Sequence, residues 1–299
     1  MQFAYYGERM KKCYLFSQCI LLVVLTSVVG IQAVHAQWSS DPDVNNPVCT
    51  KAKDQTSSVS ASDGAGGAII AWTDYRNGTE NDVYAQRIKA SGVLQWKTDG
   101  VPIAVAANDK YVPVITGDGA GGAIIAWEDN RSGISRIYAQ RISASGLRLW
   151  TAAGDSNGIP VSNANNLFTP AIWGDGAGGA IIAWEDARTG NFDIYVQRLN
   201  PSGIRQWITG SDSNGVLVCN ATNSQNNPVL TTDGSGGAII TWEDHRGSNA
   251  DIYAQRINVN GVRQWISGKD SNGVGICKTT GDQTLPKIIS STDKNAIIT

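Results

Sequence analysis

Residues 175–188 read Asp-Gly-Ala-Gly-Gly-Ala-Ile-Ile-Ala-Trp-Glu-Asp-Ala-Arg, and this stretch recurs with little change along the chain. Its opening Asp-Gly-x-Gly-Gly turn begins at Asp63, Asp118, Asp175 and Asp233. A tryptophan follows nine residues after each aspartate, at Trp72, Trp127, Trp184 and Trp242. A second tryptophan series has a similar period, at Trp38, Trp96, Trp150, Trp207 and Trp265, so that only Trp173 falls outside the pattern. Such repetition indicates an array of equivalent structural units.

The unit from Trp150 to Trp207 shows what each repeat encodes. After a short extended piece at 158–162, residues 169–173 predict a first strand, and the glycine turn after it supplies the positive φ that hairpins need. Residues 180–184 are almost unbroken in apolar character, which is typical of a strand buried on both faces. Residues 193–198 alternate as a half-buried strand does, and 204–207 are predicted as the fourth strand.

Four strands per repeat predict an all-β fold, a β-propeller of four-stranded antiparallel blades. We expect four full repeats and a truncated fifth, with approximate bounds 38–95, 96–149, 150–206, 207–264 and 265–299 within a repeat region of 37–299. The main alternative is a flat β-solenoid, which uses shorter rungs and has no need of two tryptophans per unit. Residues 293–299 restart the repeat, so we expect further blades beyond them.

The repeated string Pro-x-Ile-x-x-Asp-Gly…Ala-Ile-Ile-Ala-Trp-Glu-Asp-x-Arg-x-Gly…Asp-Ile-Tyr resembles the WD40-like propeller repeat of the TolB type. It is also similar to repeats of secreted bacterial surface proteins and, more distantly, to the Asp-box propellers of sialidases. The resemblance implies that the strand before the Asp-Gly turn lines a central channel and that the last strand of each repeat lies outermost. The Asp-Gly-x-Gly-Gly turn, its tryptophan and a longer segment between blades depart from those relatives.

The N-terminal residues resemble a secretion signal. Arg9, Lys11 and Lys12 precede an apolar run at 19–34, and small residues at 34 and 36 suit a signal peptidase. We therefore expect residues 1–36 to be a signal peptide, removed during Gram-negative-type export, and the protein to be secreted or at the cell surface. A membrane anchor is the alternative, although the run is short for a span of about 20 residues.

Charge argues against nucleic acid and anionic membrane as partners. Residues 37–299 carry 21 basic and 25 acidic side chains and contain no basic cluster. No membrane span is expected after cleavage of the signal. The expected partner is a protein or glycan ligand.

The most visible charged motif is Trp-x-Asp-x-Arg, which is present in every full repeat. A catalytic site is singular, so we interpret these pairs as structural, each aspartate ordering its own loop. Three repeats add a glutamate before the aspartate, at Glu128, Glu185 and Glu243. The pairs are Asp74 with Arg76, Asp129 with Arg131, Asp186 with Arg188, and Asp244 with Arg246.

The variable loops after the second strand of each repeat are the candidate binding face. Propeller ligands usually sit where loops vary over a fixed scaffold. The candidate contact residues on these loops are Tyr75, Asn130, Phe192 and His245.

No metal site, cofactor or catalytic residue is expected. His245 is the only histidine after the signal, which excludes a multi-histidine zinc site there. The Asp-Ser-Asn-Gly segments at 155, 212 and 270 lack the distal glutamate of a calcium loop and are interpreted as Asx turns. Cys49, Cys219 and Cys277 occupy equivalent points of different repeats, too far apart for disulfides.

These observations favour an exported, non-catalytic propeller that serves as a binding, adhesion or scaffold module. The alternative is a sialidase-like propeller glycoside hydrolase or lyase with catalytic residues partly beyond residue 299. The two hypotheses differ in whether unrepeated acids and tyrosines occupy the inner-strand loops.

Overall fold

The structure is a computed structural model that describes residues 38, 41, 43–151, 154–209, 211–266, 271–291 and 295–299. The predicted signal peptide at 1–36 lies outside the described residues. Within those ranges every regular element is a β-strand, and no helix capable of crossing a membrane is found there.

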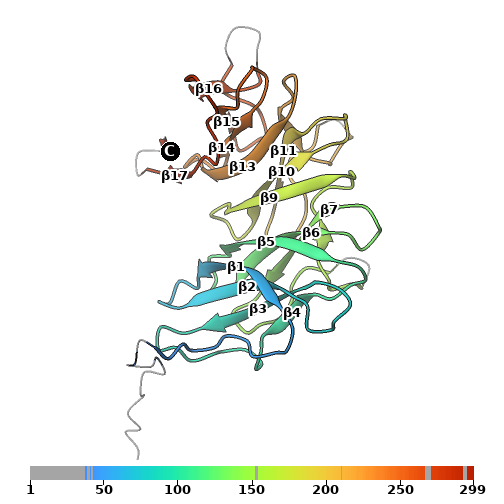
Figure 1. Ribbon diagram of the computed structural model, residues 1–299, viewed down its shortest axis with the longest axis vertical. Coiled ribbons are helices and arrows are strands. Elements are labelled where there is room, and N and C mark those ends of the chain that lie inside the picture. Colours follow the sequence, from blue (N-terminus) through green and yellow to red (C-terminus); the bar gives the residue numbers. More distant parts are fainter. Residues whose placement is uncertain are drawn as a thin grey trace, which may run out of the picture. The chain divides into compact units, whose positions relative to one another are not determined.

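The strands form four four-stranded antiparallel sheets and one two-stranded sheet (Figure 1). In each large sheet the strands are paired in chain order, so each sheet is one up-and-down blade. The first blade contains β1 (Gln55–Ser62), β2 (Ala68–Asp74), β3 (Asp82–Ile88) and β4 (Val101–Ala104), and the second contains β5 (Lys110–Gly117), β6 (Ala123–Asp129), β7 (Arg136–Ile142) and β8 (Ile159–Pro160). The third contains β9 (Leu167–Gly174), β10 (Ala180–Asp186), β11 (Asp193–Leu199) and β12 (Val216–Cys219), and the fourth contains β13 (Gln225–Thr232), β14 (Ala238–Asp244), β15 (Asp251–Ile257) and β16 (Val274–Cys277). The two-stranded sheet pairs β17 (Ile288–Ser290) with β18 (Ala296–Ile298).

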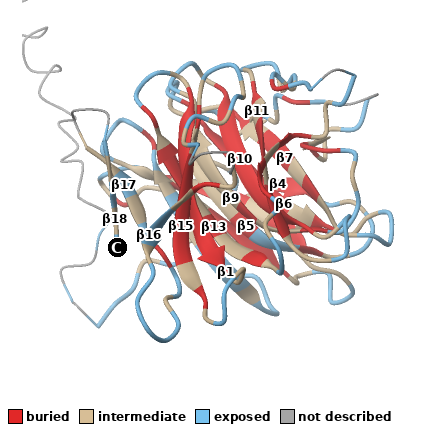
Figure 2. Cartoon of the chain, turned by 90° about the horizontal axis from the view of Figure 1, so that it is seen from above, coloured by how far each residue is buried: buried red, intermediate tan, exposed pale blue. Residues whose placement is uncertain are grey.

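Hydrophobic burial between the sheets holds the blades together. All seven residues of β10 and of β14 are buried, as the unbroken apolar run predicted, and Figure 2 shows burial concentrated in the middle strands. Each of three hydrophobic clusters joins two consecutive sheets; one packs Ile181 of β10 with Ile240 and Trp242 of β14. First strands lie side by side, β1 with β5, β5 with β9 and β9 with β13. The predicted all-β propeller of four-stranded antiparallel blades is confirmed.

The Asp-Gly turn is closed by its own aspartate. Asp175 Oδ1 accepts hydrogen bonds from the backbone N–H groups of Ala177 and Gly179, both at 2.8 Å. Its other oxygen accepts from the Arg198 guanidinium at 3.0 Å. The buried carboxylate therefore orders the hairpin that joins β9 to β10, and the other three full blades repeat these contacts.

The predicted fourth strand at 204–207 is wrong. The fourth strand of that blade is β12, and the 204–207 segment makes only an isolated bridge between Leu199 and Arg205. The Gln197 side chain accepts from the backbone N–H of Trp207 and donates to its carbonyl, both at 2.9 Å, which leaves Trp207 few backbone groups for a ladder. Its indole instead donates to the Val259 carbonyl of the next blade at 2.9 Å. The second tryptophan series thus contributes anchors between blades rather than strands.

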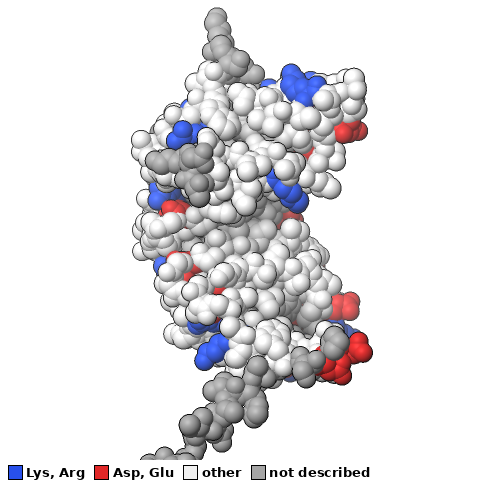
Figure 3. Space-filling model, turned by 90° about the vertical axis from the view of Figure 1, so that its left-hand side faces the viewer, with Lys and Arg blue, Asp and Glu red and all other residues white. Residues whose placement is uncertain are grey.

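The charged surface is sparse. On the face shown in Figure 3, basic and acidic side chains are scattered and most of the surface is uncharged.

Candidate functional site

The innermost strands share an irregularity that the sequence did not reveal. One residue in each of β1, β5, β9 and β13, and one in the segment before β17, has a positive φ between 47° and 55°. The register of pairing with the second strand shifts at this point in all four blades. A positive φ is unfavourable for β-branched residues such as Val112 and Thr169, and strain of this kind concentrates at functional sites. The five residues are Ser57, Val112, Thr169, Asn227 and Leu285.

Carboxylates from the preceding blade hold three of these bulges. Glu128 Oε1 accepts from the Thr169 N–H at 2.7 Å, and Glu185 Oε1 accepts from the Asn227 N–H at 2.7 Å. Glu243 Oε1 accepts from the Leu285 N–H at 2.6 Å. Each glutamate lies at the end of a second strand, so the same strand that forms the blade core places its carboxylate at the next blade.

Thr169 connects two of these carboxyl groups. Its backbone N–H binds Glu128, and its side chain is among the groups that lower the pKa of Glu185 against the effect of burial. Burial raises the pKa of the Glu128 carboxyl, and the nearby charge of Glu185 raises it further. Burial also raises the pKa of Glu185, although hydrogen bonds from Asn227, Asn226 and Thr169 oppose the rise. The two neighbouring carboxyl groups therefore differ in how strongly their surroundings favour the ionised form.

The first joint between blades lacks this carboxylate, because Thr73 stands where the later blades have glutamate. Thr73 is 3% exposed, and its hydroxyl has no hydrogen-bond partner. We expect Thr73→Glu to reach the Val112 N–H and to raise the free energy of unfolding by about 1 kcal/mol at pH 4. Burial should raise the folded-state pKa of the new carboxyl, as it does at Glu128, so the gain is present below the unfolded pKa and shrinks as pH rises.

Urea unfolding at pH 4 and pH 8 measures this effect. Thr73→Gln is the matched control, because the amide offers the same acceptor and does not titrate; its gain should not depend on pH. A loss of stability at pH 4 in both variants would show that the joint has no room for the longer side chain.

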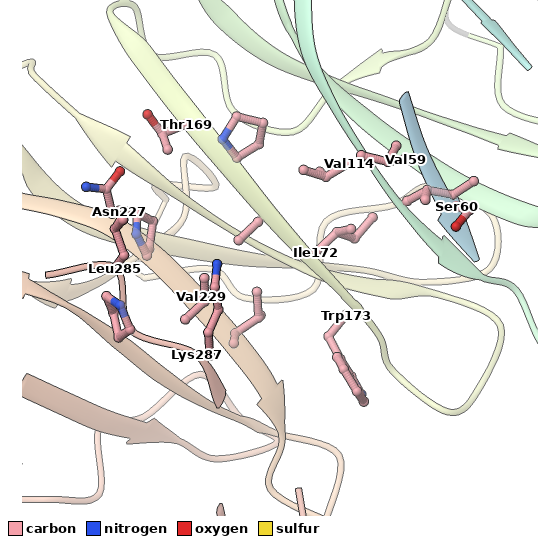
Figure 4. Close-up of a pocket in the computed structure, with 16 residues that line it drawn as sticks. Val59, Ser60, Val114, Thr169, Ile172, Trp173, Asn227, Val229, Leu285 and Lys287 are labelled. Carbon is pink, nitrogen blue, oxygen red and sulfur yellow. The ribbon is translucent and has the colours of Figure 1, made fainter. Parts of the chain in front are cut away.

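A cavity of about 550 Å³ lies along the inner strands. Its lining comes from β1, β5, β9, β13 and the segment leading into β17, and includes Thr169 and Asn227. Figure 4 shows Trp173 at the opposite end of this lining from Thr169. A second cavity of about 780 Å³ shares Ile115, Ile172 and Trp173 with the first and continues to the Asp-Gly turns of the first two blades.

Trp173 is the tryptophan that falls outside the repeat pattern. The equivalent inner-strand positions, counted from the bulge, carry Ala61, Thr116 and Thr231. Trp173 is partly buried against the core cluster between the third and fourth blades, and its remaining surface faces both cavities. An indole presented to a channel with a mainly apolar lining offers a flat face for stacking a ring.

We expect Trp173→Ala to weaken binding of a channel ligand about tenfold, since a stacked aromatic contributes about 0.5–1.5 kcal/mol. Isothermal titration with the best ligand measures the loss, and a thermal melt monitors the fold. Thr116→Ala, at the equivalent position in the second blade, should leave affinity within about twofold. Equal affinity of Trp173→Ala and the unmodified protein would place the ligand elsewhere.

The structure places each repeated Asp/Arg pair at the end of a second strand. Asp129 is fully buried and accepts from the indole of Trp127 at 2.7 Å and from Arg131 Nε at 2.8 Å. Arg131 also donates to the Asn157 carbonyl and lies over the Tyr138 ring, with 4.0 Å from guanidinium carbon to ring centroid. The pairs Asp74/Arg76, Asp186/Arg188 and Asp244/Arg246 are arranged in the same way.

The four candidate loop residues do not line either cavity described above. Tyr75 donates its hydroxyl to the Gly78 carbonyl at 2.9 Å, and the Asn130 N–H donates to the Asp109 carbonyl. The Phe192 ring packs edge-on against Phe168 at 5.8 Å between centroids. The His245 N–H donates to the Ser224 carbonyl, and this bond is equivalent to the one from Asn130 to Asp109 in the second blade. These four residues are therefore not part of the lining that Trp173 belongs to.

The Asp-Ser-Asn-Gly segments and the cysteines are explained by local structure. Asp155 accepts from the Asn157 N–H at 2.8 Å, which is an Asx turn, and Asp212 does the same with Asn214. Burial raises the pKa of the Cys219 thiol to about 12, and Cys49, Cys219 and Cys277 are free thiols. Among the described residues no group of three or more potential metal-ligating side chains is found.

The channel residues could not be predicted from the repeated motifs of the sequence. The bulges carry no common residue type, because serine, valine, threonine, asparagine and leucine occupy them in turn. The hydrogen bonds between blades join residues 41 or 42 positions apart, which a repeat alignment does not connect. Trp173 did give a signal, since it alone among ten tryptophans departs from the period.

Comparison with protein families and with curated protein sequences found no match. Similar solved structures include a thermostable family-43 glycoside hydrolase, 14% identical over 74% of this chain and 75% of that chain, with a TM-score of 0.42. An endo-arabinase from Bacteroides thetaiotaomicron VPI-5482 is 14% identical over 77% of this chain and 83% of that chain, with a TM-score of 0.39. A protein given as TolB from Agrobacterium tumefaciens is 16% identical over 69% of this chain and 60% of that chain, with a TM-score of 0.40. These likenesses assign neither substrate nor activity to this chain.

The expectation that the chain is not an enzyme is nevertheless contradicted by this comparison. The similar structures include several glycoside hydrolases, among them the family-43 enzyme, the endo-arabinase and an endo-1,4-beta-xylanase from Bacteroides thetaiotaomicron VPI-5482. The non-catalytic interpretation is withdrawn.

Proposed function

We propose that this protein is a β-propeller glycoside hydrolase that binds a glycan in the channel and cleaves it beside Thr169. The observation that carries the proposal is that one channel-lining residue, Thr169, binds Glu128 through its N–H at 2.7 Å and favours the ionised form of Glu185 through its side chain. Glycosidases use two carboxyl groups about 5 to 9.5 Å apart, one protonated and one ionised. The charge of Glu185 raises the pKa of Glu128, so the two carboxyls lie near enough to interact.

The unequal environments suggest the division of roles. Glu128 accepts a single backbone hydrogen bond, and both its burial and the charge of Glu185 raise its pKa, which suits the general acid. Glu185 receives hydrogen bonds from Asn227, Asn226 and Thr169, which favour the ionised form and suit the base or nucleophile. Glu128 would give its proton to the glycosidic oxygen as the bond from this oxygen to the anomeric carbon breaks, so that the leaving sugar departs as an alcohol. Water would attack the anomeric carbon and lose a proton to Glu185, which leaves Glu128 ionised and Glu185 protonated.

Trp173 would hold a second sugar ring further along the channel. It lies four residues from Thr169 on β9, which corresponds to roughly 13 Å of extended strand. A ligand that reached both sites would have more than one ring, so the proposed substrate is an oligo- or polysaccharide. The expected export of the chain would place the site where such polymers occur.

Release of new reducing ends from a polysaccharide panel tests the proposal. The panel includes arabinan and xylan, since an arabinase and a xylanase are among the structures similar in fold. Cleavage of at least one polymer, abolished by the double change Glu128→Gln with Glu185→Gln, is the expected result. The absence of both binding and cleavage across the panel would refute the proposed function.

A further inference from the structure

One wall position of the channel carries a charge in only one of its five copies. Two residues after the bulge, the inner strands have Val59, Val114, Ala171 and Val229, and the last copy has Lys287. All five positions line the 550 Å³ cavity. Lys287 is exposed, and Figure 4 shows its side chain extending beside Val229 along the cavity wall.

Among the described residues that line this cavity, Lys287 is the only charged one; the others are aliphatic, aromatic, proline or neutral polar. Within the described part of the chain, no carboxylate forms an ion pair with its ammonium group. Two residues earlier, the Leu285 N–H engages the Glu243 carboxylate, at 2.6 Å from its Oε1. The channel thus presents one unpaired positive charge in a neutral lining.

We propose that Lys287 selects acidic glycans by pairing with the carboxylate of a uronic acid residue bound in the channel. The inference rests on the proposed function and names its substrate class. Complementary charge contributes mainly to specificity, and an apolar wall strengthens an ion pair relative to open water. A neutral glycan would leave the ammonium group without this partner, although it would lose none of the stacking on Trp173.

Polygalacturonate and its methyl ester form a matched pair of probes, because they share one sugar backbone and differ in charge. Binding is measured in the Glu128→Gln background, so that the ligand is not consumed. We expect about fivefold tighter binding of the acidic form, which corresponds to an ion pair of about 1 kcal/mol. The preference should decrease as salt is raised.

Lys287→Met should abolish the preference and leave affinity for the ester unchanged. Lys97→Met is the control, since Lys97 is an exposed lysine outside this cavity and its loss should preserve the preference. Equal binding of acid and ester, or a preference that survives Lys287→Met, would overturn the inference while the proposed function stands. Failure to bind any member of the wider neutral and acidic panel would refute both.

Discussion

Replacing Glu128 by Gln should lower the rate of glycan cleavage by about 10²- to 10⁴-fold, the usual contribution of a general acid. The amide keeps an acceptor for the Thr169 N–H, so the joint between the second and third blades should remain folded. The lost function is proton donation. Initial rates of reducing-end release, with a thermal melt of the same sample, separate a catalytic loss from an unfolded protein.

Glu243→Gln is the matched control for this change. Glu243 makes the same contact with Leu285 that Glu128 makes with Thr169, but Leu285 has no side-chain hydroxyl to join it to a second carboxyl. We expect Glu243→Gln to retain activity within about twofold. An equal loss in both variants would mean that these glutamates serve only as clamps between blades.

The pH dependence of cleavage follows from the direction of the two pKa shifts. Activity requires protonated Glu128 and ionised Glu185, so the rate should fall as pH drops below the pKa of Glu185 and as pH rises above that of Glu128. Both limbs should lie above the ordinary glutamate value of about 4.3. Because the Glu185 charge raises the pKa of Glu128, Glu185→Gln should move any residual alkaline limb to lower pH.

Gly179→Ala should destabilise the fold by roughly 3 kcal/mol or more, the upper range for overpacking. A Cβ at this position would lie 2.1 Å from the Leu199 carbonyl oxygen and 2.8 Å from Asp175 Oδ2. The carbonyl belongs to the neighbouring strand β11, so relief requires movement of the ladder itself. Urea unfolding followed by tryptophan fluorescence measures the loss.

Gly176→Ala, in the same turn, is the comparison. Its Cβ would meet nothing within 4 Å, and only its φ of +74° opposes a side chain. The expected loss is about 1–2 kcal/mol, the penalty of a left-handed alanine. A loss at Gly179 no larger than that at Gly176 would contradict the close approach of the two strands.

Most of the fold could be predicted from the repeat. The apolar run at 180–184 and the alternation at 193–198 each encode one strand locally, the glycine turn encodes a hairpin, and the structure contains all three. The prediction of the fourth strand failed because Ile204-Arg-Gln-Trp207 has strand composition, whereas the backbone N–H and carbonyl of Trp207 are satisfied by the Gln197 side chain. Hydrogen bonding by a distant side chain leaves no mark in local periodicity.

The candidate site was less predictable because it is assembled between blades. The glutamates were visible in the sequence, but repetition suggested a purely structural role. What distinguishes Glu128 and Glu185 is Thr169, which binds Glu128 through its N–H and lowers the pKa of Glu185 through its side chain; the corresponding residues Asn227 and Leu285 have no hydroxyl. The distinction therefore depends on a single residue type at a strained position rather than on a motif.

A structure of the Glu128→Gln protein with an uncleaved oligosaccharide tests the central claim most directly. We expect sugar rings along the channel, with one ring stacked on Trp173 and a glycosidic oxygen within hydrogen-bond distance of residue 128 beside Thr169. Density for the sugar on the loops that carry Tyr75, Asn130, Phe192 and His245, with an empty channel, would contradict it.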